Sequence, residues 1–161
     1  MTVSERLRNL LLAALMLLPY LATASVPVSV KVTVVPVPCV INDGNPIVVD
    51  FEEVMTTRID GKNYRKPVDY TLSCTGMSSV LIKLKVAGTS ASFDNTVLGT
   101  SVDGLGIEFW QGSNLKLPLN SWINFMYMRP PALWAVPVKQ QGVSLKGGEF
   151  YAAATMELIY Q

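Results

Sequence analysis

The sequence predicts an all-β sandwich, from the spacing of its apolar residues and from the turn residues between them. Apolar and polar residues alternate in several short runs, which is the period of a strand with one buried face. Asn-Asp-Gly, Asp-Gly, Pro-Pro and Gly-Gly sequences separate the runs and are typical of turns. No helical period is sustained beyond residue 24. One domain is expected, because the chain has 161 residues and no linker or repeat divides it.

Seven runs are expected to form strands. In one of the clearest, Ile82 and Leu84 point to one face while Lys83 and Lys85 point to the other. The last run is the longest, and its even-numbered residues from Phe150 to Tyr160 share one face. The expected strands cover residues 46–54, 67–74, 80–86, 105–111, 122–128, 133–138 and 150–160.

Residues 1–24 have the order of a secretory signal peptide. Arg6 and Arg8 form a basic region, residues 10–18 are almost wholly apolar, and Ala22-Thr23-Ala24 supplies the small residues that a signal peptidase recognises. About nine apolar residues are too few to cross a bilayer core of roughly 30 Å, which disfavours a membrane anchor. We therefore expect an exported mature chain, residues 25–161, that carries no membrane anchor.

The composition of the mature chain excludes several classes of function. It holds 11 basic and 11 acidic residues, so no basic surface favours nucleic acid. The whole chain lacks histidine, which excludes a Ser-His-Asp triad and histidine zinc sites. Two cysteines in an exported chain predict one disulfide, Cys39 to Cys74, rather than a metal site. Closing this 36-residue loop stabilises the fold by about 4 kcal/mol on a chain-entropy model.

Neither catalysis nor a cofactor is expected. Glu52 and Glu53 are adjacent, so in an extended segment they point to opposite faces and are better suited to solvent than to acid–base work. Gly104 and Gly106 are not followed by a helix, which disfavours a phosphate site. Three tryptophans are candidates for a sugar-stacking platform, but they lie in apolar strand runs, which favours core or subunit contacts: Trp110, Trp122 and Trp134.

The mature N-terminus poses a physical problem, because its apolar face requires burial. Five valines alternate with Pro27, Ser29, Lys31 and Thr33, and the alternation stops before Cys39: Val26, Val28, Val30, Val32 and Val34. Prolines at 36 and 38 make a hinge to the rest of the chain, since proline cannot donate a ladder hydrogen bond. The segment is expected either to fold back as an edge strand or to pair with another chain by β-strand addition. Burying five valines contributes about 7–15 kcal/mol before ordering costs.

The order of these features resembles that of chaperone–usher pilins, and most closely a minor tip adaptor subunit of P-type and type 1 fimbriae. The resemblance covers the whole mature chain. It is carried by the signal, the valine segment and these sequences: residues 38–42 (PCVIN), 47–51 (IVVDF), 68–74 (VDYTLSC) and 106–112 (GIEFWQG). The ending is the most specific part, with glycine fourteenth from the end at Gly148 and the penultimate tyrosine at Tyr160.

The resemblance implies an immunoglobulin-like sandwich that lacks its final strand, formed by residues 39–161, with a donor-strand extension over residues 25–38. Cys39 and Cys74 would tie the first two strands together. The five valines would form the donor strand, and the terminal carboxylate of Gln161 would bind basic chaperone residues. The groove and chaperone-binding strand would comprise Gly148, Phe150, Ala152, Ala154, Met156, Leu158, Tyr160 and Gln161.

The implied partners are a periplasmic pilus chaperone, an outer-membrane usher, neighbouring pilins and a tip adhesin. The implied location is a fimbrium on the bacterial surface, reached through the periplasm. One departure concerns Val32, where related donor strands usually carry glycine, so that an unusual partner or a shifted register is expected. A lectin-type adhesin, a chain terminator at the fibre base and a major shaft pilin are the alternatives; three tryptophans and an apolar donor segment favour a minor subunit.

Overall fold

The computed structural model describes residues 39–76 and 81–160, all of which lie within one compact unit. The predictions for the signal peptide, for residues 25–38 with their five valines, for Val80 and for Gln161 lie outside the described residues. Within them, strands dominate and the only helical pieces are two short 3-10 turns, η1 (Asn42–Gly44) and η2 (Thr56–Arg58). The all-β prediction is confirmed.

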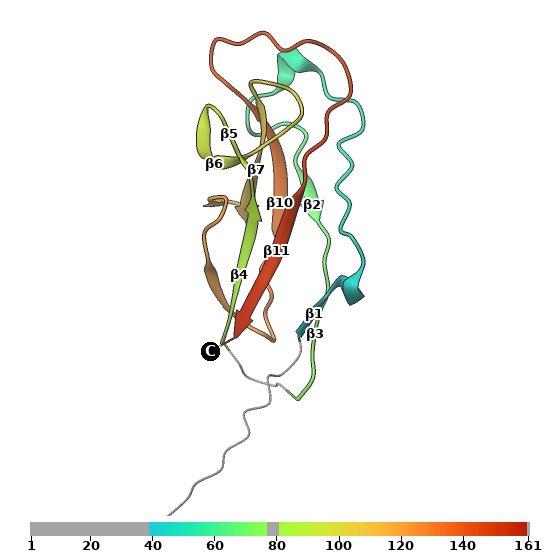
Figure 1. The fold of residues 1–161 in the computed structure, drawn as a ribbon, viewed down its shortest axis with the longest axis vertical. Coiled ribbons are helices and arrows are strands. Elements are labelled where there is room, and N and C mark those ends of the chain that lie inside the picture. The colour runs from blue at the N-terminus through green and yellow to red at the C-terminus, as the bar shows by residue number, and fades with distance from the viewer. Residues whose placement is uncertain (1–38, 77–80, 161) are drawn as a thin grey trace, which may run out of the picture. The chain divides into compact units, whose positions relative to one another are not determined.

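Two antiparallel sheets and a separate strand pair make up the fold (Figure 1). The larger sheet has the order β2 (Lys66–Val68), β10 (Leu133–Lys139), β7 (Leu105–Gln111), β6 (Asp94–Gly99) and β5 (Ser90–Ala91), with β8 (Leu115–Leu117) also on β7. The smaller sheet has the order β11 (Ala154–Tyr160), β4 (Leu81–Gly88) and β9 (Ile123–Met126). The separate pair is β1 (Cys39–Ile41) with β3 (Leu72–Cys74).

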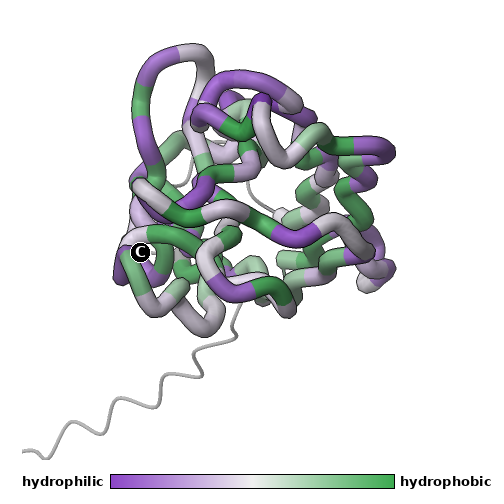
Figure 2. Tube along the Cα trace, turned by 90° about the horizontal axis from the view of Figure 1, so that it is seen from above, coloured by the Kyte–Doolittle hydropathy of each residue, from purple (hydrophilic) through white to green (hydrophobic). Residues whose placement is uncertain are grey.

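The core lies between the inner faces of the two sheets, as in a β-sandwich. Ile82 and Leu84 of β4 are fully buried, and Leu133 and Ala135 of β10 are nearly so. These residues belong to one cluster, together with Val68, Cys74, Val86, Leu98, Ile107, Phe109, Leu117, Leu119 and Phe125. Figure 2 shows hydrophobic and hydrophilic stretches interspersed along the trace. On β4 the alternation buries Ile82, Leu84 and Val86, while Lys83 and Lys85 between them are only partly buried.

The side chains of β11 alternate between its two faces as predicted. Its ladder with β4 places Met156 opposite Val86 and Leu158 opposite Leu84, so the even-numbered residues of β11 share the face of buried β4 residues. On the other face Glu157 lies opposite Lys85, and the two form an ion pair at 2.8 Å. A slip of one residue would turn the apolar face outward.

Three expected strands differ from the structure. Residues 46–54 form no ladder, because no described strand pairs with them. The expected strand 67–74 is divided into β2 and β3, because the chain bends there from one sheet into the separate pair. The expected strand 150–160 enters its ladder only at Ala154, since the backbone N–H and C=O of Tyr151 bond instead to Ser101.

The predicted disulfide is confirmed and connects β1 to β3. Cys39 and Cys74 are directly opposite each other in the ladder, with their Cα atoms 4.1 Å apart. Each of these strands is only three residues long. The covalent bond therefore fixes a strand pair that has few ladder hydrogen bonds of its own.

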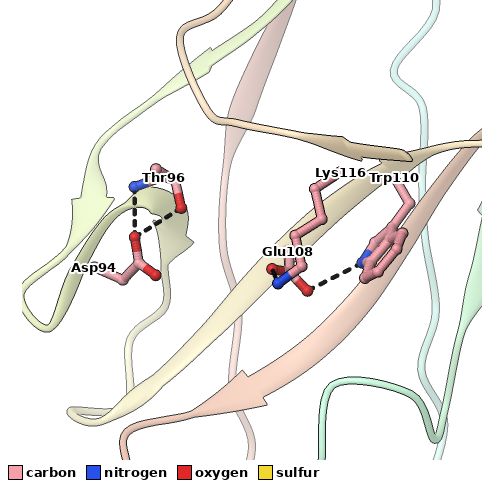
Figure 3. A network of polar contacts seen from close by, with 5 residues as sticks. All are labelled: Asp94, Thr96, Glu108, Trp110 and Lys116. Atoms are coloured by element: carbon pink, nitrogen blue, oxygen red, sulfur yellow. Dashed lines mark hydrogen bonds and ion pairs between the residues drawn. The ribbon is translucent and has the colours of Figure 1, made fainter. Parts of the chain in front are cut away.

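None of the tryptophans belongs to the core cluster, so the core part of the prediction for them is wrong. Trp110 and Trp134 are opposite each other on β7 and β10, and the Arg65 guanidinium lies over both rings at 5.7 and 4.8 Å. On the same sheet, buried Glu108 accepts hydrogen bonds from Trp110 Nε1 and from the Lys116 ammonium (Figure 3). Strong pairing to cations and to carboxylate explains why these rings lie on an outer face.

The same close-up view shows a second, separate carboxylate contact at the start of β6. Asp94 accepts hydrogen bonds from the hydroxyl and the backbone N–H of Thr96, at 2.7 and 2.8 Å (Figure 3). These bonds favour the ionised carboxylate and hold the pKa of Asp94 below its ordinary value. Asp94 thus fixes the backbone at the start of β6.

Tyr70 connects the bend between β2 and β3 to the segment before β10. Its hydroxyl donates a hydrogen bond of 2.6 Å to the carbonyl of Pro131. Burial disfavours the phenolate and raises the pKa of Tyr70 to about 12. In the unfolded chain the same group ionises near pH 10.

This difference predicts a loss of stability at high pH. The contribution of neutral Tyr70 is complete below about pH 10 and falls as the pH rises towards 12, since only the unfolded state ionises readily in that window. Urea unfolding of the mature protein and of Tyr70→Phe measures it. The stability difference between the two proteins should shrink from pH 9 to pH 12; a difference that stays constant contradicts the assignment.

Candidate functional site: an apolar groove at the open sheet edge

The site begins at the edge of the smaller sheet. Among the described residues β11 pairs only with β4, so its other edge presents backbone N–H and C=O groups that have no ladder partner. Natural proteins normally cover, shorten or charge such an edge, because it is a template for another strand. Here the edge is seven residues long and flanked by apolar side chains.

An extended segment, residues 45–51, forms the opposite side of the opening. Ile47, Val49 and Phe51 pack against the core, while Val48 and Asp50 between them are exposed. In the part of the chain that the structure describes, residues 47–51 make no backbone–backbone hydrogen bond. The segment therefore has strand alternation but lacks a strand partner, which explains why the predicted strand over 46–54 is absent.

Between these two sides lies a groove of about 1550 Å³. We call residues 45–51 the first lip and residues 147–156 the second lip. The floor is made by core residues from both sheets, among them Val86, Leu98, Ile107, Phe109 and Ala135. This volume exceeds the roughly 300–1,000 Å³ of a typical small-molecule site. In Figure 1 the first lip rises from η1 towards η2, roughly along the direction of the long strands.

Two aromatic rings narrow the groove. Phe51 of the first lip and Phe150 of the second lip lie with ring centroids 6.0 Å apart, tilted by 33°. A tilted ring pair at this separation is favourable by about 0.5–1.5 kcal/mol beyond its buried area. This contact is the point at which the two lips meet in the empty groove.

The ionisable groups that line the groove are mainly acidic. Four carboxylates, from Asp50, Glu52, Glu53 and Glu149, face two cations, Arg58 and Lys146. Glu52 pairs with Lys66 at 3.3 Å, and its backbone φ of 55° ends the alternation of the first lip. No cluster of three or more potential metal ligands occurs within residues 39–76 and 81–160.

The structure brings most of the predicted groove residues together. Gly148, Phe150, Ala152, Ala154 and Met156 all line the groove. Leu158 packs against the core but does not line the groove. Tyr160 is opposite Ile82 in the ladder. Gln161 and the five donor-strand valines lie outside the described residues.

Sequence reasoning missed the first lip and the floor. Ile47, Val49 and Phe51 were expected in a strand, but no role in the site was assigned to them. Their signal was present in the period-two pattern, which matches that of the C-terminal strand. The floor residues have no such signal, because core residues that the groove uncovers have the same sequence pattern as those that stay covered.

Comparison with known proteins identifies the family. The model of the fimbrial protein family matches residues 28–161, so the chain belongs to this family of structural pilin subunits and is not an enzyme. The resemblance to pilins is thereby confirmed.

Particular relatives narrow the likeness. The chain is 36% identical over 130 residues to the fimbrial-like protein YfcR of Escherichia coli K12, covering 78% of this chain and 75% of the relative. It is 29% identical to the fimbrial adapter PapF of Escherichia coli, covering 96% and 99%. A solved structure of PapF, the P pilus adaptor subunit, superposes with a TM-score of 0.58 at 29% identity over 78% of this chain and 98% of that one.

These matches support the expected incomplete sandwich and the similarity to a minor adaptor subunit. Fimbrial subunits build surface fimbriae, in which each subunit contacts its neighbours. Within the described residues there is no helix that combines the length and the apolar character needed to span a membrane.

The contact between the lips yields a test of the site's geometry. Phe51→Ala and Phe150→Ala should each destabilise the empty domain, with a coupling free energy of about 0.5–1.5 kcal/mol in a double-mutant cycle. Urea unfolding of the four proteins measures it. Phe93, which is not part of the groove lining, is the control: a Phe51→Ala, Phe93→Ala cycle should be additive. Additivity of the Phe51 and Phe150 changes contradicts the ring contact.

Proposed function

We propose that this chain is a structural adaptor of a pilus tip, polymerised by donor-strand exchange in the chaperone–usher pathway. Its groove accepts a β-strand from a neighbouring subunit, and its own residues 26–34 complete the groove of another subunit. It thereby joins a tip adhesin to the rest of the fibre and supports cell adhesion without binding a receptor itself.

The observation that carries the proposal is the groove between two edges that have no strand partner within residues 39–76 and 81–160. Strand β11 and the first lip each offer unpaired backbone groups, and the apolar floor lies between them. A strand laid in this space would bond on both sides and bury its alternate side chains on the floor. A compact small molecule could not satisfy two extended backbone edges at once.

The donor half of the proposal rests on the valine pattern. Burying the five alternating valines would contribute about 7–15 kcal/mol of free energy before ordering costs, which is sufficient for a tight non-covalent link. Prolines 36 and 38 separate this segment from Cys39, so it is suited to leave its own domain. Val32 in place of the usual glycine makes the register in the acceptor a separate question for experiment.

The chaperone and the usher follow from the same exposed edge. An apolar groove of this size beside an open strand would cause aggregation in free solution, so a periplasmic chaperone that lends a strand protects it until the outer-membrane usher exchanges that strand. In the proposed complex, basic residues of the chaperone bind the carboxylate of Gln161, a residue that lies outside the described part of the chain. These partners define the route through the periplasm to the cell surface.

Two observations favour an adaptor over the alternatives. A chain terminator requires a blocked groove, whereas the described residues leave a groove of about 1550 Å³ that is narrowed where Phe51 contacts Phe150. A lectin needs accessible aromatic faces, whereas cations lie over the rings of Trp110, Trp122 and Trp134.

Charge placed on the groove face should prevent strand uptake. Met156→Glu would put a carboxylate against the incoming strand, and uptake of a synthetic peptide with the sequence of residues 25–35 should fall roughly 100-fold, because burying an unpaired charge costs about 3 kcal/mol or more. Ala154→Glu, at an exposed position of the empty groove, should act in the same direction while leaving the fold intact. Fluorescence anisotropy of the labelled peptide measures both.

The matched control lies on the other face of the same strand. Ile159 is 43% exposed and points away from the core face, so Ile159→Glu should change uptake less than about threefold. Equal effects of Met156→Glu and Ile159→Glu would show that the peptide does not bind as a strand along β11.

Deletion of residues 25–35 tests the donor half. The truncated protein should still be taken up by the chaperone and should still bind the peptide, because its own groove is unchanged. It should fail to attach to its acceptor subunit, since it has no strand to give. Co-purification from cells, read by immunoblot of surface fibres, measures both. A truncated protein that joins fibres normally contradicts donor-strand exchange by this segment.

A further inference from the structure

We infer that the groove selects its strand by charge as well as by shape, favouring a strand that carries a lysine or arginine between its apolar residues. This inference rests on the proposed function, since it concerns which strand the groove takes. Apolar pockets read the residues that point inward. The outward-facing residues of a bound strand would lie beside charged groups at the rims of the groove and would interact with them.

The first lip and the turn that follows it supply one exposed carboxylate each. Asp50 lies between the core-facing Val49 and Phe51 and is exposed, so it points to the outer surface of the sheet that a bound strand would complete. Glu53 follows beyond the turn at Glu52 and is also exposed. In the described part of the chain neither carboxylate belongs to an ion pair. Both are therefore available to a cation on an incoming strand.

The other side of the groove also carries negative charge, from the second lip and from β11. Glu149 lines the groove, and Glu157 projects from the outer face of β11, although Lys85 pairs with it at 2.8 Å. The cations of the lining, Arg58 and Lys146, belong to η2 and to the loop that precedes the second lip. With four carboxylates against two cations, the groove lining has a net negative charge.

A strand between the lips has its outward residues flanked on both sides by this charge. Opposite charges on neighbouring strands attract and like charges repel where the two side chains are directly opposed. A basic residue at an outward position would therefore gain from two neighbours, and an acidic residue would lose to the same two. The occupant that fits is thus a β-strand of another pilin with alternate apolar residues and a cation between them.

The chain itself contains a segment with this chemistry. Residues 26–34 carry one ionisable side chain, Lys31, and it alternates with the valines, so it takes the outward position when they face the floor. A peptide of residues 25–35 is therefore the natural probe, and its Lys31→Glu version differs only in outward charge.

Competition between these two peptides tests the inference. The mature protein is refolded with an equimolar, isotopically distinguished mixture of both, and the retained peptides are counted by mass spectrometry after gel filtration. At low salt the Lys31 peptide should exceed its Lys31→Glu version about tenfold. Asp50→Asn combined with Glu53→Gln should bring the ratio close to one, and so should about 1 M NaCl, where the screening length falls to roughly 3 Å. Asp103→Asn, a carboxylate outside the groove lining, should leave the ratio unchanged.

The possible failures are distinguishable. Equal retention of both peptides at low salt overturns selection by charge and leaves the strand-binding function intact. Retention of neither peptide overturns the proposed function and this inference with it. A tenfold preference that persists in the Asp50→Asn, Glu53→Gln protein also overturns the inference, because the preference would then arise elsewhere.

Discussion

The unpaired edge of β11 is the constraint on which the rest of the structure depends. A sandwich needs both its sheets to cover one core, and here the smaller sheet ends one strand too early. Leu84 and Ile82 remain buried because β9 and β11 flank β4 on both sides. Val86 is buried too, but it forms part of the groove floor, where no described strand continues the sheet beyond β11. The interior is complete at one end of β4 and open at the other.

Local devices keep this incomplete domain in shape. The disulfide fixes β1 to β3, and the Glu157–Lys85 pair holds β11 in register from the outside. At Gly106 the β6 and β7 strands approach so closely that a Cβ atom would lie 2.4 Å from Val97 Cγ1, so glycine is required there. These contacts do not involve the groove opening, so they can hold the fold before a strand is bound.

Much of this architecture could be predicted from period-two patterns, and the failures have physical reasons. The faces of β4 and β11 were predictable because alternation alone decides them. The ladder over 46–54 was wrongly expected, because alternation reports a buried face but not the presence of a partner. The tryptophans were expected in core or subunit contacts from their apolar neighbours, and the core part was wrong because Arg65 and Lys116 hold Trp110 on an outer face. Contacts from residues distant in sequence decided that outcome, and no local pattern contains them.

The positive φ of Glu52 has a consequence for the strength of the link. Because the backbone turns away at that residue, two-sided pairing ends at Phe51, and any further length of an incoming strand is paired on one side only or overhangs. A longer donor strand would then add little binding free energy beyond the part that is paired on both sides. Under the proposed function, the accepting domain, rather than the length of its neighbour's donor segment, would set how much of the strand is paired on both sides.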